Sequence, residues 1–245
     1  KEITSHLYEQ CKKLDNLTIK EHWTMVDLLT KDNCCYGVVV RKDDGSLDTI
    51  TANYTVLACG GIGGIYRYST NYRHLTGDGI AVAIKHGVEL KNVNYVQIHP
   101  TTFYSEKEED RSFLISESVR GEGAKLYNNS KERFIRKEMK REGSEHVWLS
   151  MKTIDPEQLK EHFPNIVEHC KEHGYNVPDE MIPVVPAQHY FMGGIKVNLQ
   201  SKTSMDQLYA IGETACNGVH GRNRLASNSL LESMVFAKRA AKEMT

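Results

Sequence analysis

The stretch of sequence that decides the fold is Gly218-Val219-His220-Gly221-Arg222-Asn223-Arg224-Leu225-Ala226-Ser227-Asn228-Ser229-Leu230-Leu231-Glu232. It follows Leu208–Glu213, which is typical of a buried strand that ends in a glycine turn and a carboxylate. From Ser229 to Ala237 the apolar residues recur at helical spacing. The pattern therefore predicts a strand, a long polar turn and a helix.

The start of such a helix presents unpaired backbone N–H groups and the positive end of the helix dipole, which suit an atom that becomes negative during a reaction. Arg224, one turn upstream, carries a planar fork for a carboxylate, and Glu213 can accept hydrogen bonds from hydroxyls. The plainer alternative is that Asn223, Ser227 and Asn228 cap the helix and that Arg224 is a solvated charge.

Composition excludes several classes of function. The 245 residues carry a formal net charge of −1 with both signs interspersed, so neither a nucleic acid nor a membrane is expected as a partner. No apolar run reaches the ~18 residues of a spanning helix, and a cytoplasmic location is expected. The six cysteines lack CxxC spacing and are interpreted as reduced thiols. His169 and His173 share a helix face, but with no third ligand nearby in sequence we expect no metal site.

Two glycine-containing segments accompany this pattern. The apolar segment Tyr54–Cys59 leads into Gly60 and Gly61, part of a turn with four glycines in five residues, which allows close approach of the backbone or a positive φ. Thr76-Gly77-Asp78-Gly79 then opens a helix, and Asp78 alone would be an ordinary capping carboxylate.

Two histidines stand beside prolines or glycines. The strand through Val96 is predicted to end at His99-Pro100, which would expose the imidazole at an edge. Pro183–Ile195 places His189 between prolines and the pair Gly193-Gly194. Either histidine, taken alone, is more often structural.

Together these strings resemble the fumarate reductase/succinate dehydrogenase flavoprotein family. Gln97–Thr101 is similar to its Gln-Phe-His-Pro-Thr, Pro186–Gly194 to its Pro-x-x-His-Tyr-x-x-Gly-Gly, and Ile115–Gly123 to a Thr-Glu-Ala-Leu-Arg-Gly-Glu-Gly segment. The Leu225–Glu232 version is most similar to the L-aspartate oxidases of that family.

The resemblance implies a site for a four-carbon dicarboxylate beside non-covalent FAD. His99, His189 and Arg224 would be the catalytic residues that hold its two carboxylates, with Ser116 and Glu117 also in contact with substrate. The residues implied in FAD binding are Asp78, Glu213, Ser229, Leu230, Gly60 and Gly61.

The implied reaction is oxidation of L-aspartate to iminoaspartate by hydride transfer to flavin N5, with reoxidation by O2, giving H2O2, or by fumarate. This is the first step of NAD synthesis through quinolinate, with quinolinate synthase as an implied partner. One alternative is a fumarate reductase or succinate dehydrogenase flavoprotein subunit. Another is an inactive module.

The fold class expected is α/β, with a Rossmann-like FAD-binding domain and an inserted α+β capping domain. We expect residues 1–90 and 192–245 to form two pieces of the FAD-binding domain and 91–191 to form the cap.

The sequence also departs from the family pattern. No Gly-x-Gly-x-x-Gly phosphate turn follows a first strand, and the loop that carries a second arginine in the family is absent between Glu132 and Lys140. The chain begins within a helical pattern, so we expect an upstream part and predict that these 245 residues alone neither retain FAD nor oxidise aspartate. Arg222 stands where the family usually has alanine.

Overall fold

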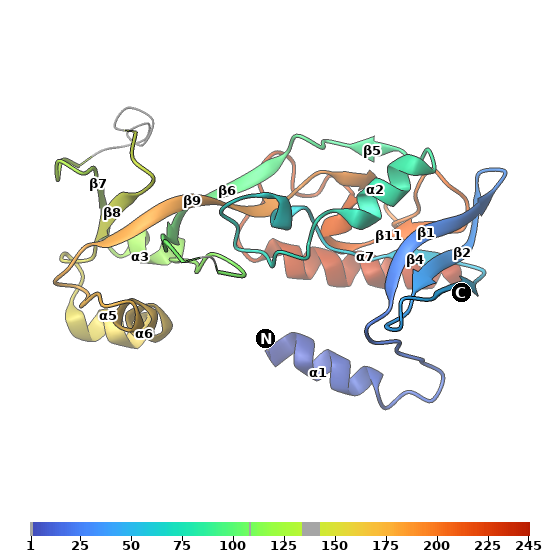
Figure 1. Cartoon of the computed structure of the whole chain (residues 1–245), viewed down its shortest axis with the longest axis horizontal. Coiled ribbons are helices and arrows are strands. Elements are labelled where there is room, and N and C mark those ends of the chain that lie inside the picture. The colour runs from blue at the N-terminus through green and yellow to red at the C-terminus, as the bar shows by residue number, and fades with distance from the viewer. Residues whose placement is uncertain (1, 108, 134–142) are drawn as a thin grey trace.

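The computed structural model describes residues 2–107, 109–133 and 143–245. The hydrophobic residues gather in two separate clusters, one toward each end of the elongated molecule in Figure 1. Strands β6 (Val96–Phe103) and β9 (Ile182–Phe191) form a long antiparallel pair that runs between these ends. The predicted α/β class with strands and helices in both parts is confirmed.

The first cluster joins segments that are far apart in sequence. Its buried residues come from residues 28–88 and from 191–215. Strand β4 (Thr55–Leu57) pairs in parallel with β11 (Leu208–Ala210), and β10 (Gly194–Lys196) lies between β12 (Ala215–Cys216) and β5 (Leu90–Lys91). Around them lie the helices and turns α2 (Asp78–Lys85), α7 (Asn228–Met244), η1 (Gly63–Ile65) and η2 (Gly212–Thr214).

An antiparallel meander adjoins this cluster, built from β1 (Thr24–Lys31), β2 (Cys34–Arg41) and β3 (Leu47–Thr51). The turn between β2 and β3 uses Gly45 at φ 82°, a conformation that glycine adopts without steric cost. The preceding helix α1 (Glu2–Cys11) buries none of its residues and lies apart in Figure 1.

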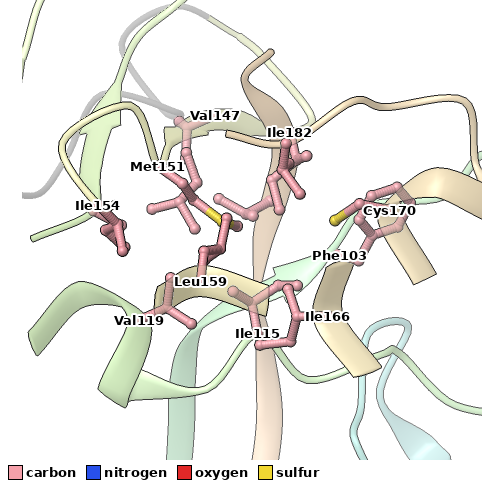
Figure 2. Packing of buried hydrophobic residues seen from close by; sticks show 14 residues of the cluster. Phe103, Ile115, Val119, Val147, Met151, Ile154, Leu159, Ile166, Cys170 and Ile182 are labelled. Carbon is pink, nitrogen blue, oxygen red and sulfur yellow. The ribbon is translucent and has the colours of Figure 1, made fainter. Parts of the chain in front are cut away.

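The second cluster packs three helices against one face of a four-stranded sheet. The sheet order is β6-β9-β8-β7, with β7 spanning Lys125–Tyr127 and β8 spanning Val147–Ser150. Figure 2 shows Val119 of α3 (Glu117–Gly121), Leu159 of α5 (Pro156–His162) and Ile166 of α6 (Pro164–Glu172) packed with strand residues such as Ile182. A proline opens both α5 and α6, where its missing N–H leaves no helical bond unmade.

The prediction that a strand ends at His99-Pro100 is wrong. Strand β6 continues to Phe103, and its pairing with β9 shifts between His99, opposite Ala187, and Thr102, opposite Val185. The irregularity accommodates Pro100, which lacks a ladder donor, without ending the strand. As a result His99 is 9% exposed and faces the interior instead of an open edge.

Candidate active site

A cavity of about 480 Å³ lies where β9, η2 and the start of α7 meet. Four residues of the predicted site line it: His189, Glu213, Arg224 and Ser229. They reach the same space from three separate parts of the sequence, because β9 ends beside the turn that follows β11.

The two predicted histidines lie side by side on neighbouring strands. The ring centroids of His99 and His189 are 5.3 Å apart and the rings meet edge to face. Nδ1 of His99 contacts the backbone of Thr101, and Nδ1 of His189 lies 2.8 Å from Oγ1 of Thr70. Burial lowers the pKa of both imidazoles. For His189, the neighbouring His99 and Arg224 act in the same direction as burial, and its pKa falls to about 4. Both rings are therefore neutral at pH 7 and can each donate one N–H.

Arg224 is 8% exposed, an unusual burial for a guanidinium. It lies 4.6 Å from the ring centroid of Tyr190, and its Nε has no hydrogen-bond partner. Among the described residues it forms no salt bridge, although Glu213 is near enough to interact with it electrostatically. The side-chain amide of Gln97 donates to its backbone carbonyl at 2.8 Å and fixes the loop. A buried cation without a direct ion-pair partner is costly, so the arrangement is complementary to an anionic ligand.

Glu213 and the glycine turn form the part of the site that the resemblance assigns to the flavin. Glu213 lines the cavity and its Oε1 accepts a 2.8 Å hydrogen bond from the Phe191 N–H. A Cβ on Gly61 would lie 2.4 Å from that Oε1, so a larger residue at this position would require the Glu213 carboxylate to move. The Cβ position of Gly60 is likewise taken up by Leu75, at 3.0 Å. These two glycines therefore allow packing within the chain, and only their backbone could meet a cofactor.

The start of α7 also fits a flavin. Ser227, at the N-cap, has φ 66° and makes no side-chain capping bond, so the N–H groups of Ser229 and Leu230 are not satisfied by a cap. Ser229 lines the cavity, while Leu230 is 42% exposed. Unpaired N–H groups at a helix start, next to a half-buried carboxylate that can accept from a polyol, match the polar groups of FAD.

His99, Leu230, Gly60 and Gly61 are not among the residues that line the cavity, and three further predicted residues also lie outside it. Ser116 caps α3 by accepting from the Ser118 N–H, and Glu117 pairs with Arg120 on the same short helix. Both Glu117 and Arg120 are near enough to influence the pKa of His99. Asp78 is exposed at the start of α2 and accepts from the Thr76 hydroxyl.

Sequence reasoning missed residues that line the cavity. Thr70 and Asn71 stand in a polar run whose only signal was composition, and Arg111 in an exposed loop had no signal at all. Asn71 and Ser69 both donate to the side-chain carbonyl of Gln188, which fixes β9 next to His189. The segment 134–140, where the sequence departs from the family pattern, lies outside the described residues.

A half-buried carboxylate, a helix start and a cation-lined cavity come together from distant segments of the chain. These are the features expected of a flavin-binding α/β protein. Comparison with known proteins supports this class. The chain belongs to the FAD-binding domain family, whose model matches residues 1–230.

Relatives of known name agree with the predicted resemblance. The chain is 49% identical to the L-aspartate oxidase of Clostridium perfringens and 44% identical to that of Clostridium acetobutylicum, with 100% of the chain aligned. It spans 58% and 59% of the length of these relatives. Its structure is similar to E. coli quinol fumarate reductase, with a TM-score of 0.86 and 30% identity over 98% of this chain and 47% of that one. The prediction of an FAD cofactor is confirmed at the level of the family. No helix in the described residues has the length and apolar character needed to cross a bilayer.

Replacing Glu213 by glutamine is expected to stabilise the flavin-free protein at alkaline pH. Burial raises the pKa of Glu213 to about 7 from 4.5, so the native state binds more protons than the unfolded state within that window. The free energy of unfolding therefore falls as pH rises through the window, and the loss is complete above pH 7. Glutamine keeps an acceptor for the Phe191 N–H and removes the charge. The expected gain is up to about 3 kcal/mol at pH 8 and smaller at pH 5.5.

Urea unfolding at the two pH values measures this gain. Glu161→Gln, an exposed site on α5, is the matched control and should shift neither curve. An equal effect of Glu213→Gln at both pH values would show that Glu213 is not desolvated.

Proposed function

We propose that the chain is the substrate-binding part of an FAD-dependent L-aspartate oxidase. The observation that carries the proposal is the buried Arg224 without a carboxylate partner among the described residues, in a cavity that His189 also lines and next to the His99–His189 pair. The curated relatives named L-aspartate oxidase support the substrate.

The chain's own groups account for dicarboxylate binding. Arg224 would pair with one carboxylate through its planar fork, and the neutral imidazoles of His99 and His189 would donate to the other. Arg111, which also lines the cavity, adds a second cation at its rim. Fixing both ends of a four-carbon diacid leaves its Cα–H bond at one position, which is the requirement for a directed transfer.

Binding of the dianion changes the protonation of the site. The His189 pKa is about 4 in the free site because burial, His99 and Arg224 disfavour the imidazolium. A bound carboxylate opposes all three effects and raises that pKa, so lower pH favours binding. The amine of aspartate must be neutral when hydride leaves. We assign the removal of its proton to no residue of this chain.

FAD, when bound, supplies the hydride acceptor. Glu213 would orient it by accepting from its polyol chain, and the N–H groups of Ser229 and Leu230 would stabilise negative charge that develops near the helix start. Asp78 and the backbone at Gly60 and Gly61 would complete the contacts. We further propose that residues 1–90 and 192–245 form the FAD-binding domain and 91–191 the cap, that O2 or fumarate reoxidises the flavin, and that the product enters NAD synthesis through quinolinate synthase.

A fumarate reductase or succinate dehydrogenase subunit is the second candidate, because the same cavity would hold a diacid without an amine. The likeness to quinol fumarate reductase favours it. The sequence identity of the chain to the L-aspartate oxidase is higher than its identity to the fumarate reductase, so we favour the oxidase.

Substrate reduction of the flavin separates the two candidates. The whole protein, loaded with FAD under anaerobic conditions, is expected to lose its oxidised-flavin absorbance on addition of L-aspartate and to retain it with succinate. Admission of oxygen should then yield H2O2. Bleaching by succinate but not by aspartate would establish the second candidate and overturn the first.

A further inference from the structure

A cluster of metal-binding side chains lies on α6, away from the flavin site. His169, Glu172 and His173 are three and four residues apart, so they share one face of the helix. One ligand atom from each lies within 4.8 Å of the others. Paired histidines four apart on a helix are a recurrent arrangement for zinc and related ions.

A further donor comes from a distant segment. Oε1 of Glu109, in the loop that follows β6, lies 3.6 Å from Nε2 of His173. The sequence could not indicate this neighbour, because the contact exists only when the loop folds onto α6. Glu109 therefore gives the cluster a ligand from outside the helix.

Each of the two histidines has a ring nitrogen that is available to a metal ion. Nδ1 of His173 lies 2.9 Å from the His169 carbonyl oxygen, which can only accept, so the proton resides on Nδ1 and Nε2 keeps a lone pair. A bond from the second ring nitrogen to a carbonyl is the usual support of a ligating histidine. His169 is held by Phe113, whose ring stacks at 3.7 Å, and its Nε2 is buried without a partner among the described residues. A buried, unpaired ring nitrogen calls for a ligand.

We propose that His169, His173, Glu109 and Glu172 form a binding site for a divalent transition-metal ion of the zinc class. Two imidazole nitrogens and two carboxylate oxygens would give such an ion the four ligands that zinc usually takes. The two carboxylates neutralise the ion.

The ion would tie α6 to one wall of the candidate active site. Glu109 begins a segment whose Arg111, Ser112 and Phe113 line the cavity, and the Ser112 N–H donates to the Ser69 carbonyl at 2.6 Å. Phe113 contacts both the cavity and the His169 ring. Metal binding would therefore hold this wall in place without taking part in the reaction.

Zinc titration of the purified protein by calorimetry tests the site. One ion per chain is expected to bind in the micromolar range, and His173→Gln and Glu109→Gln are each expected to weaken it by at least about tenfold. His162→Gln, on the neighbouring α5, is the matched control and should leave the affinity unchanged. Zinc bound by any of the six free cysteines would bind equally well to both variants. An affinity that is unchanged in both variants therefore overturns the proposal.

Limited trypsinolysis gives a readout independent of affinity. Zinc is expected to slow cleavage after Arg111, which is exposed, in the wild-type protein and not in His173→Gln. Cleavage rates that zinc leaves unchanged in the wild type, as read by mass spectrometry, would show that no ion joins this loop to the helix.

Discussion

Replacing Arg224 by leucine in the whole protein, loaded with FAD, is expected to lower kcat/KM for L-aspartate by about a thousandfold. Leucine keeps much of the apolar bulk against Tyr190 but leaves a substrate carboxylate without its cation in a shielded cavity. Removing one member of a buried ion pair costs about 3–5 kcal/mol, which corresponds to factors of about 10² to 10⁴. Flavin content should stay near the wild-type value, since Arg224 is not assigned to FAD.

Two further variants make the Arg224 experiment specific. Arg224→Lys retains the charge but loses the planar fork, so its activity is expected to lie between those of the wild type and Arg224→Leu. Arg222→Gln changes an exposed arginine two residues away, which contacts Tyr95, and should leave kcat/KM within about threefold, as for most surface substitutions. If Arg224→Leu and Arg222→Gln behaved alike in steady-state assays, Arg224 would not bind the substrate.

Replacing Gly194 by alanine is expected to destabilise the fold by about 3–5 kcal/mol. Gly194 has φ 135°, a conformation that side chains rarely adopt, and an added Cβ would lie 2.4 Å from the Thr214 carbonyl oxygen. Neither backbone can retreat easily, because β10 is paired on both sides, with Ile195 opposite Ala215 and also opposite Leu90. Expression yield should fall as well.

Gly87→Ala separates the cost of the positive φ from the cost of the close contact with Thr214. Gly87 also has a positive φ, 73°, but an added Cβ would meet nothing within 4 Å. Its expected cost is about 1–2 kcal/mol, from backbone conformation alone. Urea unfolding followed by circular dichroism measures both variants. Equal losses would mean that the close approach at Thr214 relaxes without penalty.

The family, the fold class and the flavin could be predicted from the sequence because short strings with fixed functions encode them. The Gln97–Thr101 and Pro186–Gly194 strings lie on β6 and β9, which pair in the structure. The roles of His99, His189 and Arg224 as substrate ligands remain predictions, although the structure brings the two rings together and places His189 and Arg224 in one cavity.

What the sequence could not predict depends on contacts between distant segments. Local sequence rules predict that the strand ends at Pro100. In the structure the strand continues beyond Pro100, because it pairs with β9 in an irregular register. Gly60 and Gly61 also give room to Leu75 and Glu213, which no local pattern indicates. Arg111 and Glu109 acquire their neighbours only when their loop folds against the rest of the chain.

The parallel pairing of β4 with β11 imposes an order on biosynthesis. Thr55 is opposite Leu208, so the ribosome must add roughly 150 residues after β4 before its partner exists, a wait of about 8–30 s at about 5–20 residues per second. During that time β4 and the glycine turn that follows it have an unpaired edge, which is a template for association with other nascent chains. The second cluster, whose residues all lie between Phe103 and Val184, is complete before β11 emerges. Chaperone dependence during translation should accordingly concentrate on the N-terminal third of the chain.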